Sequence, residues 1–472
     1  MAIRNVSLAP IVRQLEKNDL LPAIVFRTAR AQCDTDVERA STNRRLQVSS
    51  AKQTELRQAV EAIAKRYDTD IELIRSHPHY SSLVKTAIGA HHAGQLLTWR
   101  LVLEELMSAG LLRVLVATGT VAAGVDFPAR TVVVTAHSRR GAEGYENLSS
   151  AEFQQMSGRA GRRGKDTVGF CLVAPSMFCD GRVISETAQK PPAPLESAYF
   201  PSASTVLNLM RYRNVDDLRF TVERSLASFS DKKQAVVIRE ESDSLEGGIE
   251  ESGLPADQVK KRRKKVSRMR RKADELQSRQ MDTLEKALSG LTDLGYLDGS
   301  SLSEKGYWAA QLCTSMVIEL GEMIEKDLFK GCSGEEIAIM IGSVSGDSYR
   351  RYLSVSSNLI PNDKVQMLEE IVKNVRAAEL PGSSDSREYV EDCASTISTW
   401  LKAEDWQEFR GLLNLAGVAE GDAARLISQT ADHLNQLSRL KESHPELAKE
   451  AFYAKVKLLR PPISEALALV AN

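Results

Sequence analysis

The sequence has few cysteines, and no two of them are spaced as zinc sites or thiol-exchange sites require. Its six cysteines are scattered along the chain without a Cys-x-x-Cys pair. This pattern argues against a structural zinc site and against a disulfide framework, and it fits a reducing cytoplasm. The chain also lacks an apolar run near the roughly 18 residues of a membrane-spanning helix, and its first residues lead into no apolar signal core. We therefore expect a soluble, cytoplasmic protein with no membrane partner.

The sequence also lacks an excess of either charge. It has 62 Lys and Arg residues against 63 Asp and Glu, a formal net charge of -1. Any basic surface for nucleic acid must therefore be local. One local excess stands out, because residues 260–272 carry ten basic side chains in thirteen positions and follow an acidic stretch at 240–251. Two interpretations stay open: an arm that follows phosphates, with steeply salt-dependent binding, or a solvated helix face neutralised by the acidic stretch.

Short apolar runs alternate with helical patterns over roughly residues 20–180. Strands are expected over Leu21–Phe26, Ala87–Ala90, Leu112–Ala117, Thr131–Ala136 and Val168–Val173. Nearly continuous apolar runs are typical of buried parallel strands, so this part predicts a parallel α/β domain. Function in such sheets lies on the loops beyond the carboxyl ends of the strands. From Val317 to the C-terminus the pattern is helical throughout, and a chain of 472 residues has room for two to four domains.

One stretch alternates glycine with arginine: Gln155-Met-Ser-Gly-Arg-Ala-Gly-Arg-Arg-Gly164. Glycine lets the backbone turn tightly and approach a ligand closely. Arginine presents a planar, charged fork of donors that matches phosphate. The combination suits stabilisation of the charge that develops during phosphoryl transfer. Gly-Arg runs also occur in disordered RNA-binding tails, but here a predicted helix precedes the stretch and a predicted strand follows it.

This stretch resembles motif VI of superfamily-two helicases. Upstream, the segment Val114-Leu-Val-Ala-Thr-Gly-Thr-Val-Ala-Ala-Gly-Val-Asp-Phe-Pro-Ala-Arg-Thr131 resembles motif V. Together, in this order and at this spacing, the two motifs resemble those of the superkiller-type, exosome-associated branch of DExH RNA helicases. The segment from Pro194 through Phe229 resembles the connector that follows the second RecA-like domain in that branch.

The resemblance implies an order of domains along the chain. It places a second RecA-like helicase domain, an α/β fold with motifs IV, V and VI, over residues 1–180. A connector follows over 181–279, a winged-helix-like module over 280–318, and an all-α helical bundle over 319–472. Some members of the family carry a large arch insertion near the connector, and this chain has no room for it.

The resemblance also implies residue roles around the nucleotide. Gln155, Arg159 and Arg162 match the motif VI positions that face the γ-phosphate of ATP, with Arg162 as the arginine finger and Arg159 as a second phosphate contact. Gly124 and Asp126 match motif V positions that approach the nucleotide. Asp126 has an alternative role, since it could cap the turn before Pro128.

A second set of positions is implied to lie along a single strand of RNA, or of DNA. The last three of these positions share one face of the predicted ratchet helix over Glu420–Leu437. The nine positions are Arg27, Thr28, His92, Gly94, Thr118, Thr120, Arg425, Gln429 and His433. For the ratchet positions the alternative is a solvated amphipathic face.

Histidine and tryptophan offer two further alternatives. His91 and His92 are adjacent and point in different directions, with no carboxylate at metal spacing, so no metal site is expected there. The four tryptophans could stack on bases, although core packing is the expected role for each.

Two elements of a superfamily-two motor are missing from the sequence: the phosphate loop GxxxxGK[ST] and the DExH box that holds Mg²⁺. ATP with Mg²⁺ would therefore need a first RecA-like half, supplied in cis or in trans, and the chain alone is expected to be inactive. The first hypothesis is the C-terminal half of an ATP-dependent RNA helicase. The alternatives are a motor-less nucleic-acid-binding adaptor and a DNA helicase of the same superfamily.

Overall fold

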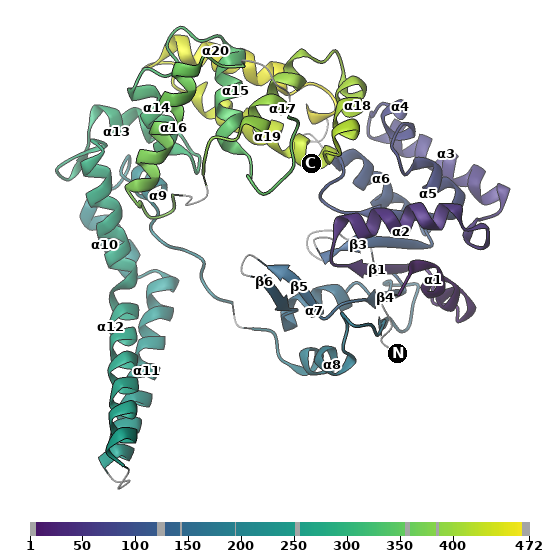
Figure 1. Ribbon diagram of the computed structural model, residues 1–472, viewed down its shortest axis with the longest axis horizontal. Helices are drawn as coiled ribbons and strands as arrows, with labels where there is room; N and C mark the ends of the chain where they lie inside the picture. The colour runs from purple at the N-terminus through teal and green to yellow at the C-terminus, as the bar shows by residue number, and fades with distance from the viewer. Residues whose placement is uncertain are drawn as a thin grey trace. The chain divides into compact units, whose positions relative to one another are not determined.

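The computed structural model describes residues 6–119, 128–141, 144–193, 195–250, 255–354, 359–383 and 387–464 (Figure 1). The chain forms two compact units. The first contains the described residues within Met1–Pro194, Ala403–Arg425 and Arg460–Asn472, and the second those within Leu195–Lys402 and Leu426–Leu459. Residues 403–425 pack with the N-terminal part of the chain, and the domain boundaries expected from the sequence stay a prediction.

The first unit is built on a five-stranded parallel sheet. Its strands are β1 (Ala23–Arg27), β2 (Ile88–His91), β3 (Val114–Thr118), β4 (Thr131–Val134) and β7 (Phe170–Val173). Their order is β2-β3-β1-β4-β7, and every pair is parallel. The structure thus confirms the predicted parallel sheet, with strand ends within a few residues of those expected.

Side chains that alternate along each strand build a core on both faces of the sheet. From β1, Ala23 and Val25 pack with α1 (Leu8–Lys17) and α2 (Arg30–Thr42). Ile24 and Phe26 point to the other face. That face is covered by α3 (Ser50–Arg66), α4 (Ile71–Arg75), α5 (Tyr80–Thr86), α6 (Leu97–Ser108), α7 (Ser150–Ser157) and α8 (Gly181–Gln189). Helices on both faces explain why the strands read as continuous apolar runs.

A two-stranded antiparallel hairpin, β5 (Ser138–Gly141) and β6 (Gly144–Asn147), was not expected from the sequence. Its strands read Ser-Arg-Arg-Gly and Gly-Tyr-Glu-Asn, which have no alternation of apolar and polar residues. Periodicity therefore gave no signal for it.

The second unit is almost entirely helical. Its most extended feature is a hairpin of two long helices that lie side by side, α11 (Leu226–Glu250) and α12 (Ala256–Asp293) (Figure 1). The other helices in it are α9 (Ala203–Leu209), α10 (Val215–Glu223), α13 (Glu304–Ala309), α14 (Val317–Glu325), α15 (Gly334–Ser345), α16 (Asn362–Ala377), α17 (Glu391–Lys402) and α20 (Pro445–Leu458). The short strands β8 (Leu297–Asp298) and β9 (Ser301–Leu302) join α12 to α13. The winged-helix interpretation of this segment stays a prediction. Within the described residues, no helix has both the length and the apolar composition needed to cross a membrane.

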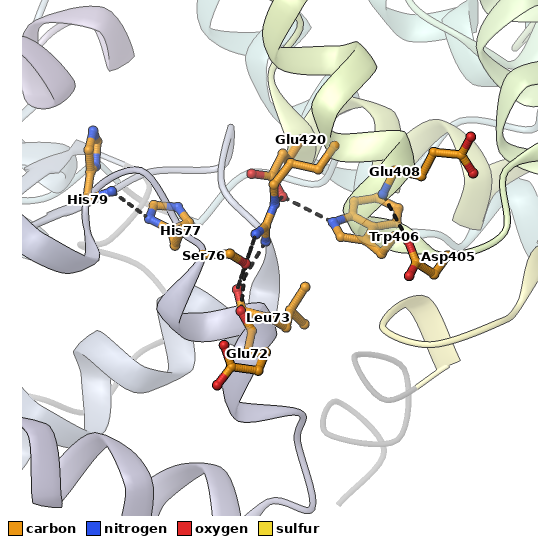
Figure 2. Close-up of polar contacts among 10 residues, drawn as sticks. Glu72, Leu73, Ser76, His77, His79, Asp405, Trp406, Glu408 and Glu420 are labelled. Carbon is orange, nitrogen blue, oxygen red and sulfur yellow. Dashed lines mark hydrogen bonds and ion pairs between the residues drawn. The ribbon is translucent and has the colours of Figure 1, made fainter.

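Helix α18 (Trp406–Ala416) and the start of α19 (Glu420–Leu437) attach to the first unit through a buried arginine. Arg410 is 5% exposed, and its Nε donates to Glu420 Oε2 at 2.9 Å. Its Nη1 donates to Ser76 Oγ at 2.6 Å, and both Nη atoms donate to the Leu73 carbonyl at the end of α4. Figure 2 shows Leu73 and Ser76 facing Glu420 across this contact, with Trp406 donating to Glu420 as well.

The four tryptophans are buried, which confirms core packing as their role. Their exposed fractions are 2% for Trp99, 8% for Trp308, 0% for Trp400 and 3% for Trp406. Trp400 Nε1 donates to the Leu458 carbonyl at 2.9 Å, so its polar end is satisfied inside the protein. None of the four indoles is placed to stack on a base.

Removing the arginine from this contact should destabilise the first unit. Arg410→Met leaves the Glu420 carboxylate buried without its cationic partner, and we expect the free energy of unfolding to fall by about 3 kcal/mol. Urea unfolding followed by tryptophan fluorescence measures this. The double variant Arg410→Met with Glu420→Gln should recover more than half of the loss, because the amide introduced at position 420 is neutral and can still accept from Trp406. Simple additivity of the two single effects would contradict this account.

Candidate functional site

A cavity of about 380 Å³ lies at the carboxyl edge of the sheet in the first unit. Its walls come from the ends of β1, β3 and β4, from β5 and the residue after β6, and from α7. The lining residues are Phe26, Arg27, Thr28, Thr118, Gly119, Val134, Thr135, Ala136, Ser138, Arg139, Leu148, Glu152, Gln155 and Met156. This is the edge at which open α/β sheets bind ligands. Four residues predicted from separate motifs, Arg27, Thr28, Thr118 and Gln155, meet at this cavity.

Helix α7, which contributes Gln155, is fixed at its start by a capping box. Ser149 Oγ accepts from the Glu152 N–H at 3.1 Å, and Glu152 accepts from the Ser149 N–H at 2.9 Å. Arg139 of β5 donates to Glu152 Oε1 at 2.6 Å. Although partial burial acts to raise it, the Ser149 hydrogen bonds and the Arg139 ion pair hold the pKa of Glu152 below its usual value. The carboxylate thus joins the hairpin to the helix beside the cavity.

The glycine-arginine loop after α7 is held by backbone contacts that only glycine permits. The Gly161 N–H donates to the Ala129 carbonyl at 2.7 Å, and the Ala129 N–H donates to the Arg159 carbonyl at 2.9 Å. Gly161 has φ +92°, a conformation that L side chains rarely adopt. A Cβ on Gly169 would lie 2.5 Å from the Ala160 carbonyl. The loop is therefore fastened between the start of β4 and the start of β7.

Asp166 holds the side chain of Arg162 in place. Its carboxylate accepts from Arg162 Nε at 2.8 Å, from Nη2 at 3.0 Å and from the Arg162 N–H at 2.9 Å. Arg130 Nη1 also donates to it, at 3.2 Å. The Asp166 side chain is 1% exposed, and the hydrogen bonds from Arg162 hold its pKa well below the usual range. The Arg162 side chain keeps 22% of its surface exposed, so it is positioned but still reachable.

The structure separates the three motif VI positions. Gln155 is exposed and lines the cavity, whereas Arg159 and Arg162 follow on the loop and are not part of the cavity lining. Arg159 and Arg162 are each partly buried. Three motif V positions, Thr120, Gly124 and Asp126, lie outside the described residues.

Arg27 has a structural role that its position at the end of β1 did not suggest. It is 3% exposed, its Nε donates to Asp36 Oδ2 at 2.7 Å, and its Nη2 donates to the Val6 carbonyl at 3.0 Å. The charge of this side chain is thus paired inside the protein, and its expected contact with a single strand stays a prediction. Thr28, the next residue, is exposed and lines the cavity.

His92 and Gly94 are likewise buried and engaged with the protein. His92 Nδ1 accepts from the Gly94 N–H at 3.2 Å, so Nε2 carries the proton that faces Asp34 Oδ1 at 2.8 Å. The Gly94 carbonyl accepts from the Gly421 N–H at 3.0 Å, at the start of α19. A Cβ on Gly421 would lie 2.6 Å from the Ala93 carbonyl. Both backbone polar groups of Gly94 therefore have a partner inside the protein, and the expected backbone contact with a strand stays a prediction.

The adjacent His91 pairs with Glu104 at 2.7 Å, and burial lowers the pKa of His91. Among the described residues, no group of three or more His, Cys, Asp or Glu side chains could hold a metal ion.

The three predicted ratchet positions on α19 differ in exposure. Arg425 is exposed and Gln429 is partly exposed. His433 faces inward, where Nδ1 lies 2.9 Å from Thr314 Oγ1. Burial, with Arg387 nearby, lowers the pKa of His433 to about 4. His433 thus ties α19 to the segment before α14, and its expected place among strand-contacting residues stays a prediction.

Sequence reasoning missed Asp166, Arg410 and Glu420. Asp166 lies four residues after Arg162, and this spacing was the available signal. Arg410 and Glu420 each occupy an ordinary polar position in a helical pattern, so nothing in the sequence indicated their burial.

Substitution of Gly169 should disrupt the arginine loop. In Gly169→Ala the new methyl group meets the Ala160 carbonyl and the Gly161 nitrogen, both backbone atoms that cannot rotate away. We expect a loss of about 2 kcal/mol in the free energy of unfolding. The control is Gly181→Ala at the start of α8, where a Cβ meets nothing within 4 Å. Equal stability of the two variants would contradict the proposed packing.

The partly buried His433 should make stability depend on pH. Its pKa of about 4 in the folded chain is below the value of about 6.5 in the unfolded chain. The unfolded state therefore binds more protons in this interval, so the contribution is complete above pH 6.5 and falls as pH decreases towards 4. Between about pH 7 and pH 5, wild type should lose roughly 2 kcal/mol more than His433→Gln. Urea unfolding at each pH measures this, and parallel curves for the two proteins would refute it.

Residues 71–164 match the helicase conserved C-terminal domain, and residues 299–466 match the DSHCT (NUC185) domain. Superkiller complex protein 2 of Homo sapiens is 32% identical over 233 residues, which is 48% of this chain and 18% of that protein. The probable helicase HelY of Mycobacterium tuberculosis is 29% identical over 227 residues, 48% of this chain and 25% of that protein.

The DExH-box ATP-dependent RNA helicase DExH10 of Arabidopsis thaliana is 32% identical over 203 residues, 42% of this chain and 20% of that protein. The matched region spans only 18% to 25% of the length of these relatives. The two domains occur in the order expected from the motifs. The chain therefore contains a helicase conserved C-terminal domain followed by a DSHCT domain, and it is similar to the C-terminal part of superkiller-type superfamily-two helicases.

Proposed function

We propose that this chain provides the second RecA-like half of an ATP-dependent RNA helicase, with Arg162 as its arginine finger. The observation that carries the proposal is the Arg162–Asp166 arrangement. Two parallel hydrogen bonds and a backbone contact fix the guanidinium on a glycine-supported loop beyond α7. A finger needs this kind of fixed orientation, because stabilisation of developing charge depends on donors that are already in place.

The chemistry of the donor set fits a phosphate. A guanidinium has five N–H donors, and Asp166 takes two of those on Arg162, so donors remain for the γ-phosphate of ATP. Arg159 on the same loop would provide a second phosphate contact, and Gln155 would face the same ligand. Mg²⁺ would be held by the first RecA-like half, where it neutralises charge on the phosphates. Thr120, Gly124 and Asp126 keep their motif V roles as part of the proposal.

The cavity at the carboxyl edge would accept the backbone of a single strand. Thr28 is exposed there and Thr118 ends β3 beside it. Hydroxyl groups of this kind hold phosphates without reading bases. On α19, Arg425 and Gln429 would contact the strand further along its path. The proposal names RNA rather than DNA as the substrate because two of the relatives are named RNA helicases. The winged-helix-like module over 280–318 and a cytoplasmic location belong to the same proposal.

The proposal predicts that Arg162→Ala abolishes ATP turnover. The assay combines the purified chain with a family-type first RecA-like half in trans and measures ATP hydrolysis with single-stranded RNA. Loss of the finger should lower kcat on the order of 10³-fold or more, with a smaller change in KM, because the contact acts mainly in the transition state. Asp166→Asn should lower kcat by less, because the finger is kept but loses its orientation.

The matched control is Arg163→Ala, an exposed arginine on the same loop. It removes the same charge one residue away and should leave turnover within about twofold, as ordinary surface substitutions do. Binding of single-stranded RNA without turnover, with and without the added half, would favour the adaptor alternative. Equal losses for Arg162→Ala and Arg163→Ala would contradict the role of Arg162 as the finger.

A further inference from the structure

The α11–α12 hairpin is a long element with a thin core. Helix α12 has 38 residues and is therefore roughly 57 Å long at 1.5 Å per residue. Its buried contacts with α11 are small and centre on Ala235, Ala273 and Leu276. Much of the surface of α12 is thus available to solvent, and its charge pattern decides what that surface can bind.

The half of the hairpin nearer the body of the second unit is neutralised by ion pairs between the two helices. Arg239 of α11 pairs with Asp274 of α12 at 2.7 Å, and Arg279 of α12 pairs with Asp231. Farther out, Arg270 pairs with Asp243 at 2.7 Å and also with Glu246. The hydrogen bond from Arg270 lowers the pKa of Asp243. The acidic residues of α11 are therefore partly used on Arg270, at the inner end of the basic segment.

The outer half of α12 is not neutralised in this way. Lys260, Lys264 and Arg268 are exposed and, among the described residues, form no ion pair, although Arg268 borders a hollow that Glu240 and Glu241 of α11 also line. Their spacing of four places them along one side of the helix, about 6 Å apart. The side that faces α11 is occupied instead by Val266 and Ala273, which are buried. This surface is named the outer basic stripe and consists of Lys260, Lys264 and Arg268.

The flanks of the stripe carry the same charge. The positions beside it on α12 are Lys261, Arg263, Lys265 and Arg271, all of them exposed. Only Arg271 has a carboxylate partner in the described part of the chain, Glu275 at 3.4 Å on the same helix. Salt bridges between exposed side chains of this kind contribute little and leave the cation accessible. The interpretation as a face neutralised by the preceding acidic stretch therefore applies to Arg270 and in part to Arg268, but not to Lys260 and Lys264.

We propose that the outer basic stripe of α12 binds the phosphodiester backbone of a nucleic-acid duplex. A stiff helix with evenly spaced cations fits a stiff, regular row of phosphates, and a duplex presents about one negative charge per 1.7 Å of its axis. An acidic protein surface rarely offers so dense and regular a row. The surface lies outside the cavity and the residues assigned to the single strand, so this inference does not depend on the proposed motor function.

The contact is sequence-independent and acts through counterion release. In a protein that acts on RNA it would hold a paired region while a single strand occupies the cavity.

The test is the salt dependence of duplex binding by the full chain. The probe is a fluorescently labelled RNA duplex of about 20 base pairs, which covers the length of α12, titrated between about 50 and 200 mM salt. The variant combines Lys260→Gln, Lys264→Gln and Arg268→Gln. Glutamine keeps the length and the helix propensity, so the hairpin should persist, as circular dichroism would verify. The slope of log affinity against log salt should fall by about three, one for each lost phosphate contact.

The matched control combines Lys326→Gln, Lys373→Gln and Lys441→Gln, three exposed lysines elsewhere in the second unit. It changes the net charge by the same amount and should leave the slope unchanged. Equal slopes for the stripe variant and the control would overturn the proposal. Binding of poly-glutamate as tight as that of the duplex, lost in the stripe variant, would also overturn it and would assign the surface to an acidic protein partner.

Discussion

The buried guanidinium of Arg410 joins the N-terminal part of the first unit to α18 and the start of α19. It satisfies the carbonyl of Leu73 and the hydroxyl of Ser76 at the end of α4, and it neutralises Glu420 at the start of α19 (Figure 2). Burial of two charges is costly unless each is paired and hydrogen-bonded. Here one side chain meets both requirements. A sheet domain that would otherwise end near residue 194 thus incorporates a helix from more than 200 residues later.

Charge is used in a different way at the arginine loop and on the long hairpin. Asp166 is buried and fully engaged, and it fixes the orientation of Arg162 while part of that guanidinium stays exposed. On the outer half of α12 the side chains of Lys260, Lys264 and Arg268 are exposed to solvent and form no ion pair with a described residue. The first arrangement suits a single, directed contact with a ligand. The second suits a mobile counterion-like contact with a polyanion. Both follow from whether a carboxylate lies within reach of the cation.

Much of the fold could be predicted from the sequence because buried strands appear in it as runs of apolar residues. The runs around Val25, Val116 and Val133 are apolar since helices cover both faces of the sheet, and each of these segments is a strand. The tight turn of the arginine loop could also be predicted from its glycines, and Gly161 does have a positive φ. Where a residue's role depends on a distant partner, nothing in the sequence indicated that partner. Arg27 lies at the end of a strand, where a ligand contact was expected, and its guanidinium forms an ion pair with Asp36.

The same limit explains the remaining differences. His92 and Gly94 sit in a loop that suggested a strand contact, but the glycine at 421 packs against that loop and uses its carbonyl. The β5–β6 hairpin has no apolar alternation to reveal it. The acidic and basic stretches of α11 and α12 were visible in the sequence. Which cations meet which carboxylates depends on the antiparallel register of two helices, and this register is a tertiary property.

The discontinuity of the first unit has a consequence for the order in which the chain can fold. During synthesis the strands of the sheet appear within the first 173 residues, but Arg410 follows only after the chain between 195 and 402 has been made. Until then the end of α4 has no partner for the Leu73 carbonyl, and the loop at Gly94 has no Gly421 against it. Domains usually fold as units from the N-terminus. Here the first unit can be completed only after the segment 195–402 of the second unit has been synthesised.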